Sequence, residues 1–215
     1  MKMELNKKPD KFNEIWPGQY EIFSWMEYVT AIPQPIFLIT TYKENQIPNA
    51  CLHAWSTFSG EGENYYTIIS ILKNTHTYKN ILEENEFCLN FPDYRYIELC
   101  FKTIKNNELN INEIENSGFT IENSKEINTP RIKECFLNME CTFEWQKDYF
   151  NDSKWVVICG KIINIAMEED RLKKGLNGRY SDLGYIYNIH SPKNPINGKS
   201  CEDEIGKIEI FKKNR

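Results

Sequence analysis

The chain has no long apolar run, no CxxC pair and no cluster of basic residues. Its longest apolar stretches, at residues 36–41 and 155–160, are far shorter than the roughly 20 residues of a membrane-spanning helix. Residues 1–10 are polar and lack the apolar core of a secretion signal. The 26 Lys and Arg residues against 31 Asp and Glu give a net charge of −5 without a basic footprint for nucleic acid. These absences predict a cytoplasmic protein that binds neither a membrane nor a nucleic acid.

Disulfide and metal frameworks are also missing. The cysteines are odd in number and widely spaced, which predicts neither a disulfide scaffold nor a zinc site; they are Cys51, Cys88, Cys100, Cys135, Cys141, Cys159 and Cys201. Most are expected to be small core residues in a reducing compartment. The alternative is a nucleophilic cysteine, which would need a partner such as His53 nearby. Gly-rich loops of the dinucleotide and P-loop types are absent too, which argues against the commonest nucleotide folds.

Short apolar runs rich in β-branched and aromatic residues fill much of the remaining sequence. They predict strands at residues 36–42, 48–59, 65–72, 87–91, 135–145 and 154–167. Helical spacing predicts helices at residues 75–84 and 94–104, with shorter ones at 111–115 and 168–174. Strands that follow one another in hairpins, with helices inserted, favour a mainly β antiparallel barrel.

Neither an internal repeat nor a domain linker is found, so one domain over residues 1–215 is the simplest expectation. Within it we expect a leader at residues 1–30, a polar surface excursion at 105–133 and an irregular tail at 180–215.

Two neighbouring segments could carry chemistry. The first ends the second predicted strand and offers backbone groups and hydroxyls beside aromatic rings, in the order Ala54, Trp55, Ser56, Thr57 and Phe58. The second opens the helix at residue 75 with the run Lys73, Asn74, Thr75, His76 and Thr77. A helix start presents free N–H groups and a partial positive charge, which suit a phosphate. An ordinary half-buried strand and a plain helix cap are the alternatives for these two segments.

The ordered set of segments resembles the flavin-reductase-like FMN-binding proteins of the flavoredoxin group. The matching segments are residues 36–41, 49–59, 68–72, 77–81 and 87–90, followed by strands at 135–145 and 156–165. The resemblance covers most of residues 30–185 and lies in the order of the segments rather than in any single motif. It implies an antiparallel Greek-key split β-barrel of the FMN-binding type.

The resemblance also implies FMN bound at a homodimer interface, with residues 54–58 along its ring. Trp55 and Ser56 would flank the ring next to Ala54, and Ser70 and Ile71 would lie beneath it. The phosphate and ribityl oxygens would contact Thr57 and the helix start, at Lys73, Asn74, His76 and Thr77. His76 departs from the family, where a small polar residue or an arginine is common.

Three functions follow as hypotheses. The first is an FMN-dependent oxidoreductase that passes electrons from NADH or NADPH through FMN to a small-molecule acceptor, so that no protein side chain need act as a catalyst. The second is a non-catalytic FMN-binding protein for electron transfer or flavin storage. The third is a barrel without a cofactor, in which the polar strand ends serve only capping and packing.

Overall fold

A computed structural model describes residues 1–14, 18–105, 107–200 and 204–211. The chain separates into two compact units. The larger unit contains Pro35–Ile186 and the segment from Lys207 on, and the smaller contains Met1–Gln34 and Tyr187–Gly206. The expected count of one domain stays a prediction, and each unit is described by itself.

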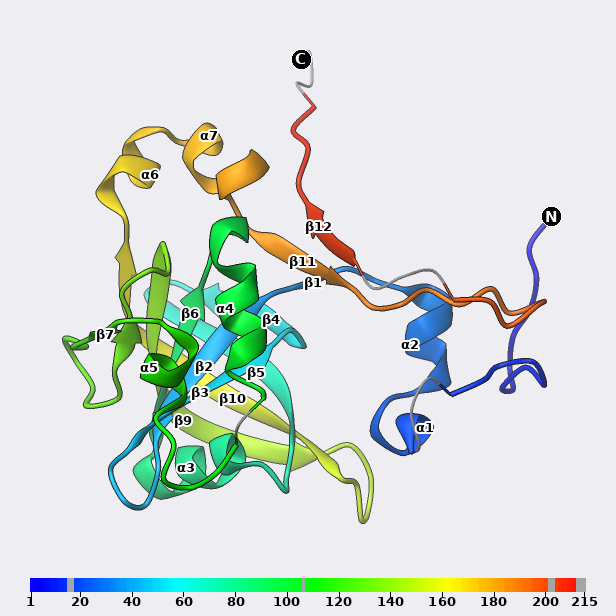
Figure 1. The fold of residues 1–215 in the computed structure, drawn as a ribbon, viewed down its shortest axis with the longest axis horizontal. Coiled ribbons are helices and arrows are strands. Elements are labelled where there is room, and N and C mark those ends of the chain that lie inside the picture. Colours follow the sequence, from blue (N-terminus) through cyan, green and yellow to red (C-terminus); the bar gives the residue numbers. More distant parts are fainter. Residues whose placement is uncertain (15–17, 106, 201–203, 212–215) are drawn as a thin grey trace. The chain divides into compact units, whose positions relative to one another are not determined.

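The larger unit is built on a seven-stranded antiparallel sheet with the order β3-β2-β6-β9-β10-β5-β4 (Figure 1). Its strands are β2 (Phe37–Tyr42), β3 (Pro48–His53), β4 (Ser56–Glu61), β5 (Asn64–Leu72), β6 (Glu86–Phe91), β9 (Leu137–Asp148) and β10 (Trp155–Met167). The two edge strands, β3 and β4, are consecutive in the chain. Ala54 and Trp55 therefore carry the chain from one edge of the sheet to the other, as in a barrel that is split between these strands. The predicted mainly β split barrel with inserted helices is confirmed.

The predicted single strand at residues 48–59 is wrong in one respect, because it is two strands. Pro48–His53 pairs with β2, whereas Ser56–Glu61 pairs with β5. β2 and β5 lie far apart in the sheet order, so one continuous strand cannot pair with both. Regular pairing therefore stops at Ala54 and Trp55. The amide of Ser70 still donates to the carbonyl of Trp55 at 3.1 Å, which anchors this crossing segment to β5.

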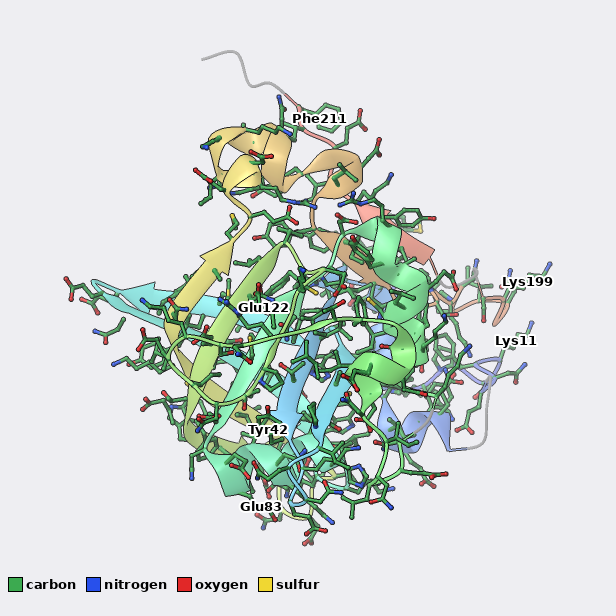
Figure 2. The ribbon with its side chains drawn as sticks, turned by 60° about the vertical axis from the view of Figure 1, so that its left-hand side comes forward. Lys11, Tyr42, Glu83, Glu122, Lys199 and Phe211 are labelled. Atoms are coloured by element: carbon green, nitrogen blue, oxygen red, sulfur yellow. The ribbon has the colours of Figure 1, made fainter. Side chains whose placement is uncertain are left out.

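Helices cover the ends and one side of the sheet. They are α3 (His76–Glu84), η1 (Tyr94–Tyr96), α4 (Ile97–Lys102), α5 (Glu113–Ser117), α6 (Glu169–Lys173), α7 (Leu176–Arg179) and η2 (Ser181–Leu183). Thr75 caps α3, because its hydroxyl accepts a hydrogen bond from the Tyr78 amide at 3.2 Å. Figure 2 shows Tyr42, the last residue of β2, and Glu83 of α3 at the same end of this unit.

The predicted surface excursion at residues 105–133 is wrong in part, because much of it packs inward. Ile114, Phe119 and Ile132 are buried, and the short strands β7 (Ile121–Glu122) and β8 (Arg131–Ile132) pair with each other. Glu113 is buried as well and forms an ion pair with Lys43, which directly follows β2. Apolar residues spaced among many Asn and Glu residues gave too weak a periodic signal to show this burial.

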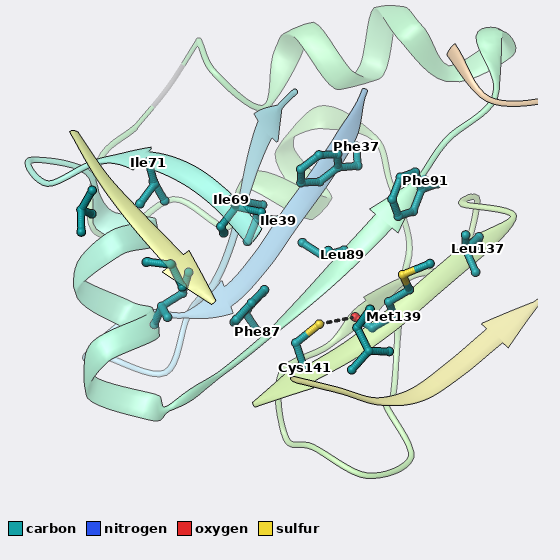
Figure 3. Close-up of a cluster of buried hydrophobic side chains, with 14 of the residues drawn as sticks. Phe37, Ile39, Ile69, Ile71, Phe87, Leu89, Phe91, Leu137, Met139 and Cys141 are labelled. Atoms are coloured by element: carbon teal, nitrogen blue, oxygen red, sulfur yellow. Dashed lines mark hydrogen bonds between the residues drawn. The ribbon is translucent and has the colours of Figure 1, made fainter. Parts of the chain in front are cut away.

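The apolar core lies between the inward faces of the strands (Figure 3). Phe37 and Ile39 of β2 meet Ile69 and Ile71 of β5 across this core, and all four are at most 3% exposed. Gly160 sits beside a register shift in β10, and a Cβ at this position would lie 2.3 Å from the ring of Phe87. The close approach of the β6 ring to the β10 backbone therefore requires glycine.

The smaller unit joins the N-terminal segment to part of the tail. It contains α1 (Gln19–Ile22), α2 (Trp25–Thr30) and most of β11 (Ile186–Ile189) and β12 (Glu204–Lys207), so the expectation of an irregular tail is wrong for these two strands. Lys193 is buried with its ammonium 5.4 to 5.6 Å from the ring centres of Phe12, Tyr20 and Tyr28. This cation–aromatic cluster holds the tail against the leader. Polar and Asn-rich sequence hid it, because the cluster forms between segments about 170 residues apart.

The cysteines behave as predicted where they are described. Cys88, Cys100, Cys135, Cys141 and Cys159 are free and buried, and Cys51 is free and half-buried. Burial raises the pKa of the Cys88 and Cys100 thiols, so these side chains stay neutral. Cys201 lies outside the described residues. None of the described helices has the length and apolar character needed to cross a membrane.

Candidate functional site

A small pocket opens where β3 meets the start of α3. It is lined by residues 49–51 of β3 and residues 75–77 at the start of α3. Thr103, Ile104 and Asn107, which follow α4, complete the lining. Its free space of about 80 Å³ is enough for a few water molecules or one phosphate group. The lining combines polar and apolar surface and includes Thr75, His76 and Thr77 at the start of α3. The pocket therefore has the size and the donors of an oxyanion site.

Side-chain hydrogen bonds hold the start of α3 against the strands beside the pocket. The Asn49 amide nitrogen donates to the Thr77 hydroxyl at 3.1 Å and to the Thr41 hydroxyl at 3.2 Å. Asn80, one turn after Thr77, donates to the same Thr41 hydroxyl at 2.8 Å. This network joins β2, β3 and α3, so the orientation of the helix start is set by the barrel itself.

Two predicted site residues, His76 and Thr77, lie together in the pocket. Lys73 does not line it, because its ammonium is 2.6 Å from Asp148 at the end of β9. Asn74 is exposed and does not line it either. The helix start thus divides into a part that faces the pocket and a part that faces the β9–β10 hairpin. A sequence cannot show this division, because Asp148 is 75 residues away.

The other predicted residues lie along the crossing between β3 and β4. Thr57 is exposed and pairs with Ile68, and Ser70 lies two residues farther along β5, so Thr57 and Ser70 share the outer face of the sheet. The Trp55 ring lies 5.7 Å from the ring of Trp155. Ile71 is only 3% exposed and belongs to the core, so only its backbone can face a ligand outside the barrel. Ala54 is buried at the start of the crossing.

Two buried polar atoms in these segments lack a partner. Ser56 Oγ and His76 Nδ1 form no hydrogen bond with any group in the part of the chain that the structure describes. Buried polar atoms in folded proteins are nearly always paired, so an unpaired one calls for an explanation. A polar ligand at each position would supply the missing partner.

His53 is a buried neutral base next to the crossing segment. It is 7% exposed, and its ring lies 5.5 Å from Phe37 and 5.7 Å from Trp55. Burial lowers the pKa of His53 to about 4, although a hydrogen bond with the Ser70 backbone opposes the shift. The imidazole is therefore uncharged at neutral pH, and its Nε2 has no partner among the described residues.

We expect His53 to make the stability of the protein fall with acid. The unfolded chain binds a proton at this side chain below about pH 6.5, whereas the folded protein resists until about pH 4. Folding free energy should therefore be lost as the pH falls from 6.5 to 4, by at most about 3 kcal/mol. Urea unfolding of the wild type and of His53→Gln at several pH values measures this loss. A variant with the same acid dependence as the wild type would contradict the role of His53.

The chain resembles known proteins. The sequence profile of the flavin reductase like domain matches residues 29–185. The chain belongs to this flavin-reductase-like family. An uncharacterized protein of Aquifex aeolicus (strain VF5) is 28% identical over 155 residues, which are 69% of this chain and 76% of that protein.

Solved structures share the fold of this chain. Nitrilotriacetate monooxygenase component B from Bacillus cereus superposes with a TM-score of 0.69 at 18% identity, over 94% of this chain and 98% of that one. Flavoredoxin of Desulfovibrio vulgaris (Miyazaki F) gives a TM-score of 0.64 at 18% identity, over 85% and 91% of the two chains. At these identities the likeness concerns the fold.

The residues that line the pocket fit the phosphate group of FMN. The pocket offers hydroxyls and helix amides to a terminal phosphate, and Ser56 Oγ and His76 Nδ1 are unpartnered among the described residues. Asn49, Cys51, Thr103 and Asn107 also line the pocket and were not predicted as site residues. A polar Asn49 inside an otherwise apolar strand was the signal that could have pointed to the first of them.

Proposed function

We propose that this protein is an FMN-dependent oxidoreductase that passes electrons from NADH or NADPH to a small-molecule acceptor. The observation that carries the proposal is the pocket at the start of α3, which lies within the segment that matches the family profile. Its donors suit the phosphate of FMN, and the segment that leads from β3 into β4 supplies Trp55 and the hydroxyls for the ring.

The chain's own residues hold and orient the cofactor. The Thr77 hydroxyl and the amides at the start of α3 would bind the phosphate, with Asn49 keeping Thr77 in place. Thr57 and Ser70 would face the ring on the outer side of the sheet, and Trp55 would shield it from water. FMN, when bound, supplies the hydride and electron chemistry. The protein is cytoplasmic on this proposal.

A homodimer completes the proposal. Ile68 of β5 and Val157 of β10 are half-buried on the outer face of the sheet, and Trp145 of β9, which lies opposite Cys159 on the same face, is 46% exposed. An apolar sheet face of this kind supports pairing with a second copy about a two-fold axis. Light scattering after gel filtration should give twice the mass of the 25.5 kDa chain, whereas a monomer at micromolar concentration would contradict the dimer.

Anaerobic reduction of the FMN-loaded protein tests the reaction. We expect the flavin absorbance to bleach within seconds of mixing with NADH or NADPH, and to recover when an acceptor is added. Free FMN at the same concentration is the control, because it reacts slowly with either nucleotide. A bound flavin that dithionite reduces but neither nucleotide does would contradict the reductase and favour the electron-transfer protein.

A further inference from the structure

A buried ion pair between Lys43 and Glu113 leaves one carboxylate oxygen unused among the described residues. The Lys43 ammonium is 2.6 Å from Glu113 Oε1, and the two side chains are 0% and 2% exposed. Lys43 also donates to the carbonyls of Glu108 and Ile111, at 2.9 and 2.6 Å, so its three donors are all used. Glu113 Oε2 finds no hydrogen-bond partner among the described residues.

The charge of Glu113 reaches the pocket. The Glu113 carboxylate adds to the rise in the pKa of Cys51, which burial raises to about 11 despite a hydrogen bond with Thr77. Burial also raises the pKa of Glu113, and the charges of Lys43 and His76 oppose that rise. Glu113 of α5 therefore lies within electrostatic reach of Cys51 on β3 and of His76 on α3.

Of the pocket-lining residues that the structure describes, His76 is the only one able to carry a positive charge. Two lysines close to these segments are committed elsewhere, Lys43 to Glu113 and Lys73 to Asp148. The Cys51 thiol stays neutral at any pH below about 10. A phosphate dianion that enters this pocket would consequently meet hydroxyls, amides and a single side chain that can neutralise it.

We propose that His76 takes up a proton when the phosphate of FMN binds, so that the protein holds FMN more weakly as the pH rises. The negative charges of the phosphate and of the Glu113 carboxylate would both stabilise the imidazolium. This inference rests on the proposed FMN site and adds its regulation. Histidine is suited to the task, because its neutral imidazole can take up a proton and become a cation.

The direction in which the Kd for FMN changes with pH distinguishes protonation of His76 from protonation of the FMN phosphate. The phosphate gains its second negative charge near pH 6, so titration of FMN alone would strengthen binding as the pH rises. Proton uptake by His76 does the opposite. Between pH 6.5 and 8.5 we expect the Kd for FMN to rise about fivefold, as follows from the linkage of one proton to binding.

Flavin titrations of the apoprotein at pH 6.5, 7.5 and 8.5 and constant ionic strength test the proposal, with flavin fluorescence as the readout. Riboflavin, which lacks the phosphate, is the matched ligand, and its Kd should not rise with pH. His76→Asn should bind FMN more weakly and lose the rise. His76→Lys should bind FMN with little change over this range, since a lysine stays charged.

Two results would overturn the inference while leaving the FMN site intact. One is a Kd for FMN that is flat or falls with pH in the wild type. The other is a rise that persists in His76→Asn. An apoprotein that binds neither flavin at any pH would overturn the proposed function itself, and this inference with it.

Discussion

Glu113→Gln should destabilise the protein by about 3–5 kcal/mol, because it leaves the charge of Lys43 buried without a counter-ion. Lys43 is fully buried and cannot turn its ammonium to water without moving the segment at residues 108–113. Urea unfolding at pH 7 measures the loss. Glu115→Gln is the matched control on the same helix, since Glu115 is exposed, and it should cost less than about 1 kcal/mol.

A double variant shows whether the two charges act as a pair. Lys43→Met combined with Glu113→Leu removes both charges and keeps similar volumes, so it should cost clearly less than the sum of the two single changes. Additive losses, or a Glu113→Gln variant as stable as its control, would show that the ion pair does not secure α5 against the barrel.

His76→Glu should raise the Kd for FMN by about 100-fold or more. The change places a carboxylate beside a phosphate dianion, and each pair of unit charges about 4 Å apart near a protein surface costs on the order of 1–4 kcal/mol. Riboflavin should bind this variant within about twofold of the wild type. Fluorescence titrations with both flavins give the two constants, and the effect on FMN should shrink in high salt.

The matched control for this variant is Lys79→Glu. Lys79 is exposed on α3, one turn after His76, and does not line the pocket. It should change the Kd for FMN by less than about threefold, because charges that water separates interact weakly. Equal losses in the two variants would mean that FMN responds to the general charge of the helix. An unchanged Kd in His76→Glu would place the phosphate elsewhere.

Local sequence patterns predicted the elements whose structure depends on near neighbours. The strand at residues 36–42 and the helix at 75–84 appear with nearly the expected bounds, as β2 and α3. Thr75 caps α3 because the cap depends only on residues three positions apart. The break at Ala54 and Trp55 depends instead on which strands become partners. The strand-like sequence pattern of residues 48–59 shows no interruption at this point.

The candidate site was predicted in part for the same reason. His76 and Thr77 lie in the pocket because the helix start alone positions them. Lys73 was expected at the phosphate but pairs with Asp148, which lies 75 residues later in the chain. The link between Lys43 and Glu113 spans 70 residues and carries no local signal. Contacts between residues so far apart in the chain can be predicted only when the order of the strands in the sheet is known, and the sequence did not reveal that order.

The most direct test of the account is whether the purified protein binds FMN. The apoprotein should take up one FMN per chain, with a shifted flavin absorbance and quenched fluorescence, and should release unmodified FMN when it is denatured. Uptake should be much weaker in His76→Glu and should remain in Lys79→Glu. A folded protein that carries no flavin and takes up none from a micromolar solution would contradict the central claim, and the start of α3 would then be a plain helix cap.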